Sequence, residues 1–475
     1  MPAVIAIDQG TTGSKAYRLD TSGAFEQLGG FEHRQIFPQA GWVEHDASEL
    51  LDRVRRLAAM GGDAQALGID NQGETVIAWD GESGEPIYNA IVWQDARSQH
   101  MIERLKADGA EALTVEHAGL PLDPYFSASK LRWILDHVPA AKSLLARGKL
   151  RMGTSDSFFL DRLAGVYATD VTTASRTSLM NLKAGQWDGE LCRLFGVPME
   201  CLAEIRPTVG EYGSAGRLPI RANIVDQQAA LFGHGCRRGG QAKITFGTGA
   251  FALAVAERDI DPKAIAGMNR TVAWQIGKAP MIYAVEGGIY NAASAVNWAR
   301  GLGLFDAFSE IDGFAAAPAI ERGLIFVPAL SGLAAPYWDR NAAGLWLGMG
   351  LETSRSDMMQ SLLEGVALLA SELIVAMNRA TPLSGAVSID GGLSKNPYFC
   401  DFLAEALERP VSVPASADLT GLGTAQLTLI GAGLAAIGSL PPAPPPRRVA
   451  RPEGRLSKAG RVRFAEALAR CRNWR

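Results

Sequence analysis

Two short glycine-threonine turns have the composition of phosphate-binding loops. The first is Asp8-Gln-Gly-Thr-Thr-Gly-Ser14, and the second, almost half the chain later, is Phe246-Gly-Thr-Gly249. Backbone N–H groups and hydroxyls at tight glycine-containing turns form concavities that bind anions. Two such turns could hold a triphosphate from both sides, and Lys15 could add a positive charge beside the first. No GxxxxGK[ST] motif is present, so the chain does not use a P-loop.

Two carboxylates stand in places where they could assist phosphoryl transfer. This reaction needs an acceptor hydroxyl aligned with the γ-phosphate, a group that takes its proton, and neutralisation of charge by Mg²⁺. Asp8 ends a β-rich run beside the first turn, and Asp226 opens a run of helix formers. Asp226 therefore has two interpretations from its local sequence, a helix cap or a catalytic base.

The residues around both turns predict the same structural unit. β-rich runs at residues 4–7 and 15–19 flank the first turn, and runs at 242–245 and 251–255 flank the second. Each pair predicts a β-hairpin. The repetition indicates a duplicated domain. Gly and Arg cluster at residues 233–240, where we place the boundary between a first domain of residues 1–236 and a second of 237–475.

Helical and β-rich segments alternate through both halves and predict layered α/β domains. Helices are predicted at residues 129–137, 226–231 and 356–379, and further β-rich runs at 324–328 and 386–389. A Gly-, Ala- and Leu-rich stretch at 425–437 predicts a buried helix packed on a sheet, and the basic tail at 456–475 predicts a docked terminal helix. Single cores stop growing beyond about 250–300 residues, which favours two large domains in a chain of 475 residues.

Composition argues against several classes of function. The formal net charge is −4, so no basic field attracts nucleic acid or a membrane surface. The five cysteines show no CxxC spacing, which argues against a disulfide framework or a zinc site and favours a reducing, cytoplasmic compartment. We expect neither a signal peptide nor an apolar run of about 18 residues that could span a membrane.

The two turns belong to a longer series of motifs through which the chain resembles the FGGY carbohydrate kinases, and among them the glycerol kinases. The resemblance runs from about residue 3 to residue 438. Its other motifs are Gly41-Trp-Val-Glu-His-Asp46, Asn89-Ala-Ile-Val-Trp-Gln94, Asp123-Pro-Tyr-Phe-Ser127, Trp133-Ile-Leu-Asp-His137, Ala174-Ser-Arg-Thr177, Asp226-Gln-Gln-Ala-Ala-Leu-Phe-Gly233, Ala335-Pro-Tyr-Trp-Asp339 and Asp390-Gly-Gly392. The resemblance implies two domains of the actin, hexokinase and Hsp70 type, which are ribonuclease H-like, with the active site in the cleft between them.

The resemblance also implies an activity and its residues. The activity is ATP- and Mg²⁺-dependent phosphorylation of a small polyol, glycerol to sn-glycerol 3-phosphate, with Asp226 as general base and Asp8 and Asp226 near Mg²⁺ through water. The implied polyol site comprises Glu74, Trp93, Tyr125, Asp226, Gln227 and Phe251. The implied ATP site comprises Thr11, Thr12, Gly13, Lys15, Gly247, Thr248, Ala293, Asn297, Gly392 and Asn396. Ala293 stands where a glycine is usual. A carboxylate that orients hydroxyls beside aromatic rings that cover C–H edges suits a polyol.

One departure from the family pattern concerns the acceptor. Glycerol kinases carry Asn-Gln-Arg-Glu-Thr, whereas this chain reads Asn71-Gln-Gly-Glu-Thr75. Gly73 removes a guanidinium with up to five donors. Either the vacated space admits a longer acceptor such as erythritol, threitol, a pentitol or a ketose, or Arg97, a water or a neighbouring side chain takes over the role. Ala96 also replaces an arginine that is common in glycerol kinases.

Other functions remain as alternatives. From a different class, the chain could be an actin- or Hsp70-like ATPase that drives partner binding, or a catalytically silent sugar sensor, but the polyol-site residues and Asp226 argue against both. The expected partners are a polyol and ATP. Family members are often dimers or tetramers, so the resemblance implies a homodimer or homotetramer. Residues 212–222 are short and lack the Gly-rich basic loop through which some bacterial glycerol kinases bind a bisphosphorylated sugar, so we expect no such feedback.

Overall fold

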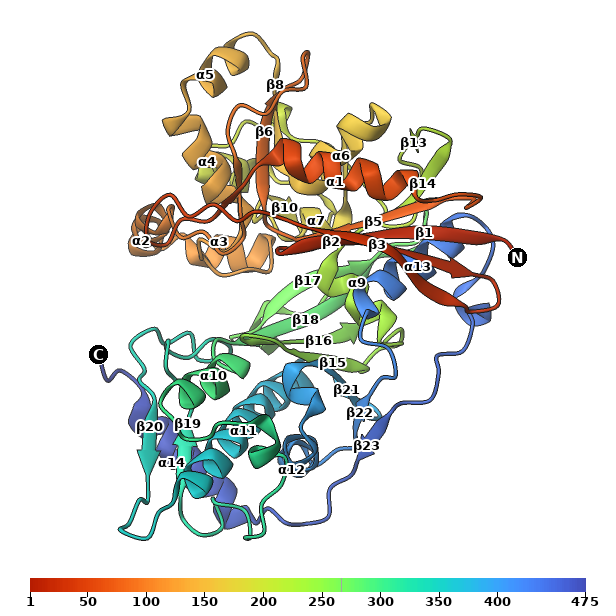
Figure 1. The fold of residues 1–475 in the computed structure, drawn as a ribbon. Coiled ribbons are helices and arrows are strands. Elements are labelled where there is room, and N and C mark those ends of the chain that lie inside the picture. Colours follow the sequence, from red (N-terminus) through yellow and green to blue (C-terminus); the bar gives the residue numbers. More distant parts are fainter. Residues whose placement is uncertain (266) are drawn as a thin grey trace.

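The N-terminal half is built on a six-stranded mixed sheet. In the computed structural model, which describes residues 1–265 and 267–475, its strand order is β13-β14-β5-β1-β2-β3 (Figure 1). The bounds are β1 Ala3–Gln9, β2 Gly13–Asp20, β3 Phe25–Glu32, β5 Leu67–Asn71, β13 Ser214–Ala215 and β14 Leu218–Val225. The first predicted hairpin is confirmed, because β1 pairs antiparallel with β2, while β5 runs parallel to β1 on its other side.

The C-terminal half repeats this arrangement in a seven-stranded sheet of order β17-β18-β16-β15-β21-β22-β23. The bounds are β15 Ala242–Phe246, β16 Ala250–Ala256, β17 Asn269–Trp274, β18 Ile282–Ile289, β21 Val387–Gly391, β22 Val411–Val413 and β23 Arg448–Ala450. β15 pairs antiparallel with β16 and parallel with β21. The order β18-β16-β15-β21 thus matches β3-β2-β1-β5 in strand direction, which confirms the predicted second hairpin and the duplication.

Smaller elements extend the N-terminal half. A four-stranded sheet has the order β4-β7-β6-β8. Its bounds are β4 Glu44–His45, β6 Val76–Asp80, β7 Ala90–Ile91 and β8 Leu150–Thr154. The remaining short strands of this half are β9 Ala168–Asp170, β10 Met180–Asn181, β11 Gln186–Trp187 and β12 Glu204–Arg206. Its helices are α1 Ala47–Ala59, α2 Gln99–Ala107, α3 Glu111–His117, α4 Ser127–His137, α5 Pro139–Ala146, α6 Ser155–Ala164, α7 Val171–Ala174, α8 Gly189–Phe195 and α9 Asp226–Gly233.

The C-terminal half adds a hairpin and five helices. The hairpin strands are β19 Ile325–Val327 and β20 Leu345–Leu347, and the helices are α10 Ala293–Gly301, α11 Arg355–Ala380, α12 Pro397–Leu407, α13 Leu419–Gly431 and α14 Lys458–Cys471. The predicted helices 129–137, 226–231 and 356–379 correspond to α4, α9 and α11, and the two predicted β-rich runs to β19 and β21. The predicted terminal helix is α14, which buries Phe464, Leu468 and Cys471 against the core of this half.

Helix α13 differs from the prediction in both extent and position. The sequence predicts a helix at 425–437, but α13 begins at Leu419 and its C-cap is Ala432. It ends there because Gly433 adopts a left-handed φ of 70°, a common helix stop. Although α13 belongs to the C-terminal half of the sequence, it packs on β1 and β5 of the N-terminal sheet and crosses α9 (Figure 1).

Helix α11 has the length and composition of a membrane span, which the sequence did not lead us to expect. It has 26 residues and a window of mean hydropathy 1.5, so by length and composition it could cross a bilayer. In the fold, 83% of that window is buried, and its Leu362, Val366, Leu369 and Leu373 belong to the core of the C-terminal half. It is the central helix of a domain core, where an apolar surface on all sides is expected.

Candidate active site

The first glycine-threonine turn lies between β1 and β2 and reaches the predicted polyol site. The Gly10 N–H donates to the Gly13 carbonyl at 3.0 Å, and the His33 N–H donates to the Thr12 carbonyl at 3.0 Å, which fixes the turn against β3. The Trp93 indole N–H donates to the Thr11 hydroxyl at 2.9 Å. The sequence placed Thr11 and Trp93 in separate sites, whereas here one hydrogen bond connects them.

Lys15 has a partner that the sequence did not indicate. Its ammonium lies 3.2 Å from the Asp418 carboxylate, next to the start of α13. The same carboxylate oxygen accepts a hydrogen bond from the Tyr17 hydroxyl at 2.7 Å. Lys15 is about half exposed, so it can still approach an anion at the turn.

The second turn, between β15 and β16, is exposed and held by the start of α10. The N–H groups of Ala292 and Ser294 donate to the Thr248 carbonyl at 3.0 and 3.1 Å, and that of Ala293 donates to the Gly247 carbonyl at 3.1 Å. The turn and the N-terminal end of α10 therefore form one unit. The N–H groups of Ala293 and Ser294 at this helix end already donate to the turn, so the phosphate role of Gly247 and Thr248 stays a prediction.

Asp226 is the first residue of α9, and its carboxylate does not cap that helix. The N-cap residue is Val225, and this end has no side-chain capping bond, so the interpretation of Asp226 as a cap is wrong. Burial, and then the negative charges of Glu74 and Asp8, raise its pKa to about 7. A carboxyl group with a pKa near the working pH can take a proton from an alcohol and release it again.

Asp8 stands beside a second carboxylate. It is the register partner of Asp70 on the parallel strand β5, and burial raises the pKa of both groups. Asp70 is fully buried and accepts a hydrogen bond from the Thr424 hydroxyl of α13 at 2.6 Å. After burial and the charge of Asp8, the charge of Asp226 also raises the pKa of Asp70, so the carboxyl groups of Asp8, Asp70 and Asp226 influence one another's protonation.

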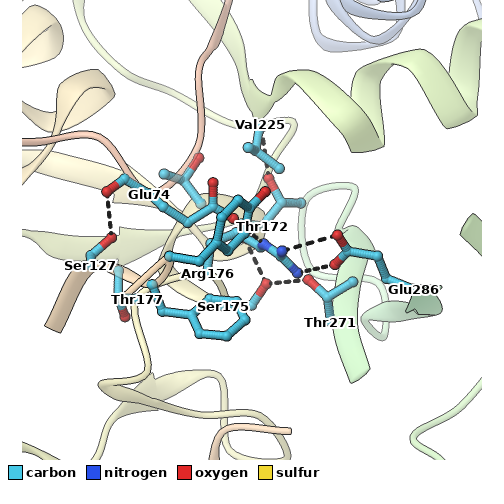
Figure 2. A network of polar contacts seen from close by, with 12 residues as sticks. Glu74, Ser127, Thr172, Ser175, Arg176, Thr177, Val225, Thr271 and Glu286 are labelled. Atoms are coloured by element: carbon cyan, nitrogen blue, oxygen red, sulfur yellow. Dashed lines mark hydrogen bonds and ion pairs between the residues drawn. The ribbon is translucent and has the colours of Figure 1, made fainter. Parts of the chain in front are cut away.

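Glu74 is held by an arginine from a distant part of the chain. Figure 2 shows Arg176, which follows α7, lying between Glu74 and Glu286. Its Nε donates to Glu74 Oε1 at 2.6 Å, and an Nη donates to Glu286 Oε1 on β18 at 3.1 Å. All three side chains are at least 95% buried. The bridge therefore fixes Glu74 and also joins the two halves of the chain.

Arg97 does not replace the arginine missing at position 73. Its guanidinium pairs with Glu44 and Asp95 at 2.7 and 2.8 Å and lies 3.8 Å from the ring centroid of Trp42. It is fully buried in this separate network, so that prediction is wrong. The neighbouring side chain at Glu74 is Arg176.

The predicted aromatic wall is formed by half-buried rings. Trp93 and Tyr125 meet edge to face with ring centroids 5.5 Å apart, and the Arg176 guanidinium lies 5.9 Å from the Tyr125 ring. The buried Lys130 ammonium fixes the loop that carries Tyr125, because it donates to the carbonyls of Pro124, Tyr125 and Phe126 at 2.8, 2.6 and 3.1 Å. Burial lowers the pKa of Lys130 to about 8.

Gln227 and Phe251 come from the two halves. Gln227 lies on α9, and its side-chain oxygen accepts a hydrogen bond from the buried Lys243 ammonium of β15 at 2.7 Å. Phe251 is a half-buried residue of β16. Burial lowers the pKa of Lys243, and the carboxylates that oppose this shift are Asp390, then Asp226 and Glu286. Lys243 is thus a buried cation among the site carboxylates.

The residues predicted for the adenine side differ in their exposure and in how far their side chains are free to contact a ligand. Asn297 is exposed on α10. Gly392 lines a cavity of about 330 Å³ with Lys395, Ser416 and Arg447. The Asn396 amide is already used within the domain, since its oxygen caps α12 by accepting from the Phe399 N–H at 2.7 Å and its nitrogen donates to the Ile311 carbonyl at 2.7 Å. Asn396 therefore offers a ligand little of its side chain.

Four buried charged residues near the site were not among the residues predicted from the sequence. They are Asp70, Arg176, Lys243 and Glu286. A signal for two of them was available, because Lys243 and Glu286 interrupt otherwise apolar strands, β15 and β18. Charged side chains are almost never fully buried unless they are paired, so a charge inside a predicted buried strand indicates a functional or structural ion pair.

Comparison with known proteins agrees with this geometry. The N-terminal domain of the FGGY family of carbohydrate kinases matches residues 3–233, and its C-terminal domain matches residues 242–432. Glycerol kinase of Alkalilimnicola ehrlichii is 41% identical over 456 residues, covering 91% of each chain, and glycerol kinase of Trichlorobacter lovleyi is 41% identical over 453 residues, covering 91% of this chain and 90% of its own.

Solved structures agree as well. Plasmodium falciparum glycerol kinase with ADP superposes with a TM-score of 0.91 at 29% identity, covering 99% of this chain and 98% of its own. Xylulose kinase from Rhodospirillum rubrum shares the fold, with a TM-score of 0.86 at 21% identity over 98% of each chain. The chain therefore belongs to the FGGY family of carbohydrate kinases and has the two-domain fold of that family.

Proposed function

We propose that this kinase transfers the γ-phosphate of ATP to glycerol and forms sn-glycerol 3-phosphate. The observation that carries the proposal is the position of Asp226, which begins α9 beside Glu74 and Asp8 with its pKa raised to about 7. Such a carboxyl can accept the proton of an alcohol as that oxygen attacks phosphorus. Relatives about 40% identical over nine tenths of the chain bear the name glycerol kinase, which favours glycerol as the acceptor.

The acceptor is bound by both polar and aromatic groups in this proposal. Glu74, held in place by Arg176, orients the hydroxyls, and Gln227, held by Lys243, adds a polar contact. Trp93, Tyr125 and Phe251 cover the C–H edges. The hydrogen bond from Trp93 to Thr11 keeps this wall in register with the phosphate turn.

ATP occupies the space between the two turns in this proposal. Thr11, Thr12, Gly13 and Lys15 bind phosphates from the N-terminal half, and Gly247 and Thr248 bind them from the C-terminal half. Ala293, Asn297, Gly392 and Asn396 form the adenine side. Within the described residues no cluster of three or more acidic, His or Cys side chains could hold a metal unaided, which fits an ion held by one or two carboxylates, phosphates and water.

Asp8 and Asp226 are the residues that would hold Mg²⁺ through water. Their carboxylates supply hard oxygen ligands, and burial is the main cause that raises the pKa of both groups, a cost of ionisation that a nearby cation would offset. Mg²⁺ would neutralise the charge on the transferred phosphoryl group. We also propose that residues 1–236 and 237–475 act as two domains that close on the ligands, and that the enzyme works in the cytoplasm, in keeping with its five free, buried cysteines.

The decisive experiment is an ADP-release assay over glycerol, erythritol, threitol, pentitols and ketoses. Glycerol should give the highest kcat/KM. A higher value for any other acceptor would replace glycerol in the proposal while leaving the kinase chemistry intact. The same assay with fructose 1,6-bisphosphate tests the expectation of no sugar-bisphosphate feedback, and strong inhibition would contradict that expectation.

The role of Asp226 is tested by Asp226→Asn. General bases contribute about 10²–10⁴-fold, so turnover should fall by at least about 10²-fold while Tm stays close to that of the wild type. The matched control is Asp63→Asn, since Asp63 lies outside the proposed site and its side chain is largely exposed in its salt bridge to Arg18. If Asp226→Asn keeps its turnover, another residue is the base.

A further inference from the structure

Position 73 requires a glycine because of the side chains around it, not because of its backbone conformation. A Cβ atom added there would lie 2.5 Å from Cγ2 of Val225 and 3.9 Å from Cγ of Arg176. Real Cβ atoms do not approach other carbons to 2.5 Å, so any side chain at position 73 would force Val225 to move. The φ angle of Gly73 lies outside the left-handed region, so its conformation is open to other residues.

Val225 occupies an unusual place for a buried valine. It ends β14, immediately before Asp226, and its side chain is 2% exposed. Its neighbour Ile224 packs in the apolar core shared with α13, whereas Val225 lies in none of the apolar clusters formed by the described residues. Figure 2 shows it instead in the polar network of Glu74 and Arg176.

The position of Val225 is fixed by two constraints. Its N–H donates to the Thr172 hydroxyl at 3.0 Å, and in the sheet it is the register partner of Asn71 on the parallel strand β5. A β-branched side chain also has few rotamers. Its methyl groups therefore cannot turn away from position 73 at low cost.

We propose that Val225 is a specificity-determining residue of the acceptor site and that Val225 and Gly73 form a size-matched pair. Gly73 directly precedes the polyol carboxylate Glu74, and Val225 directly precedes the base Asp226, so the pair adjoins both groups that hold the acceptor in the proposed site. The volume released by the missing side chain at position 73 is filled by the valine. The site therefore keeps the length of a three-carbon polyol and excludes four- and five-carbon acceptors.

The electrostatics of the site agree with a small residue at position 73. Glu74 already pairs with Arg176, which is 2% exposed. Arg176 lies between the two buried carboxylates Glu74 and Glu286, so Glu74 has a cation without a guanidinium at position 73. The Gly73–Val225 pair leaves Arg176 as the cation of Glu74.

The proposal rests on the proposed glycerol kinase activity, and a set of variants tests both. Val225→Ala removes the Cγ2 atom and leaves a Cβ that is 3.9 Å from an added Cβ at 73. In Val225→Ala, the ratio of kcat/KM for erythritol to that for glycerol should rise at least about tenfold, as expected for one methylene of pocket length. Gly73→Ala should lower Tm and kcat/KM for glycerol. The double variant should recover both and lose the gain on erythritol.

Ile224→Val is the matched control, because it also trims a buried β14 side chain but faces the apolar core. It should lower Tm slightly and leave the acceptor ratio unchanged. An acceptor ratio in Val225→Ala within twofold of the wild type, or losses of Tm that simply add in the double variant, would overturn the proposal. Should Val225→Ala not fold, Val225→Cys takes its place, because it also removes one branch of the side chain. The same rise in the acceptor ratio is then expected.

The measurements distinguish a failure of the proposed glycerol kinase activity from a failure of the proposed size match between Gly73 and Val225. If the wild type prefers a longer acceptor to glycerol, the proposed function and the exclusion of longer acceptors both fail. The coupling between positions 73 and 225 is measured by Tm without any acceptor, so it holds or fails independently of the substrate.

Discussion

Asp226 shows how a single carboxylate obtains a catalytic pKa. It stands at a helix N-terminus, where the helix dipole would favour its ionised form, yet burial and the charges of Glu74 and Asp8 outweigh this and raise its pKa to about 7. An ordinary aspartate, with a pKa near 4, would be a weaker base for an alcohol. The raised pKa therefore leaves Asp226 only partly ionised at neutral pH, but its ionised carboxylate is a stronger base.

The pH dependence of the reaction should report this carboxyl group. Below pH 7 the free enzyme holds a proton on Asp226, so kcat/KM for glycerol should rise about tenfold per pH unit and level off above about pH 7. The value of kcat should level off at a lower pH, since a bound cation favours the ionised carboxylate. A profile measured from pH 5.5 to 8.5 checks this. A break near pH 4 in kcat/KM would mean that Asp226 is not perturbed in the free enzyme.

Arg176 is the second residue whose role depends on its surroundings. It pairs with Glu74 of the N-terminal half and Glu286 of the C-terminal half inside the protein. Breaking one partner of a buried ion pair leaves an uncompensated charge. The substitution Arg176→Lys keeps the charge but cannot reach both carboxylates with the geometry of a guanidinium.

In Arg176→Lys, KM for the acceptor should rise by about 10-fold or more, because a hydrogen bond to a charged group contributes about 1.5–3 kcal/mol. Arg270→Lys is the control. Arg270 also joins the halves, since its Nη2 donates to the carbonyls of Val115 and Glu116 at 2.7 and 2.8 Å, but it does not hold Glu74. Steady-state kinetics should show an unchanged KM in the control. Equal effects in both variants would mean that Arg176 is only a tether between the halves.

At the scale of elements, α9 is placed by a close crossing with α13. A Cβ on Gly423 of α13 would lie 1.9 Å from the Ala229 carbonyl oxygen, and a Cβ on Gly233 of α9 would lie 2.0 Å from the Leu419 carbonyl oxygen. Each helix thus presents a glycine to the backbone of the other. Because α9 begins with Asp226, this crossing also fixes the position of the base.

Gly423→Ala should therefore separate the two helices. Overpacking against backbone atoms costs about 1–3 kcal/mol or more, so Tm should fall by a few degrees and kcat should fall with it as Asp226 shifts. Gly301→Ala is the control, since nothing lies within 4 Å of an added Cβ there and alanine favours a helix by about 0.5–1 kcal/mol. Thermal unfolding and turnover of the two variants check this. An unchanged Tm in Gly423→Ala would show that the crossing can relax.

The sequence predicted local elements better than the contacts between them. Both hairpins and helices α4, α9 and α11 could be predicted, because their patterns lie within short windows. The partner of Glu74 could not, since Arg176 is 102 residues away in sequence and the change at position 73 drew attention to Arg97. The contact at position 73 could not be predicted for a similar reason, because Val225, whose Cγ2 would lie 2.5 Å from an added Cβ there, is on a distant strand that pairs with β5.

At the scale of the whole molecule, the chain returns from its C-terminal half to complete its N-terminal half. Leu419, Leu422, Leu427 and Leu429 of α13 are buried in one apolar cluster with Val4 and Ala6 of β1. Thr424 of α13 donates a hydrogen bond to Asp70 of β5, 354 residues away in sequence. The N-terminal sheet thus has one face covered by a helix that the duplication alone would assign to the other domain.

This return predicts that residues 1–236 do not fold on their own. Full burial of one Leu side chain contributes about 1.5–3 kcal/mol, so loss of the α13 leucines removes a stabilisation comparable to the whole stability of a domain, about 5–15 kcal/mol. The fragment of residues 1–236 should show no cooperative thermal transition by circular dichroism. The same fragment joined through a flexible linker to residues 414–440, which supply α13, should recover a cooperative transition. A fragment that unfolds cooperatively without α13 would show that the N-terminal sheet is stable without this cover.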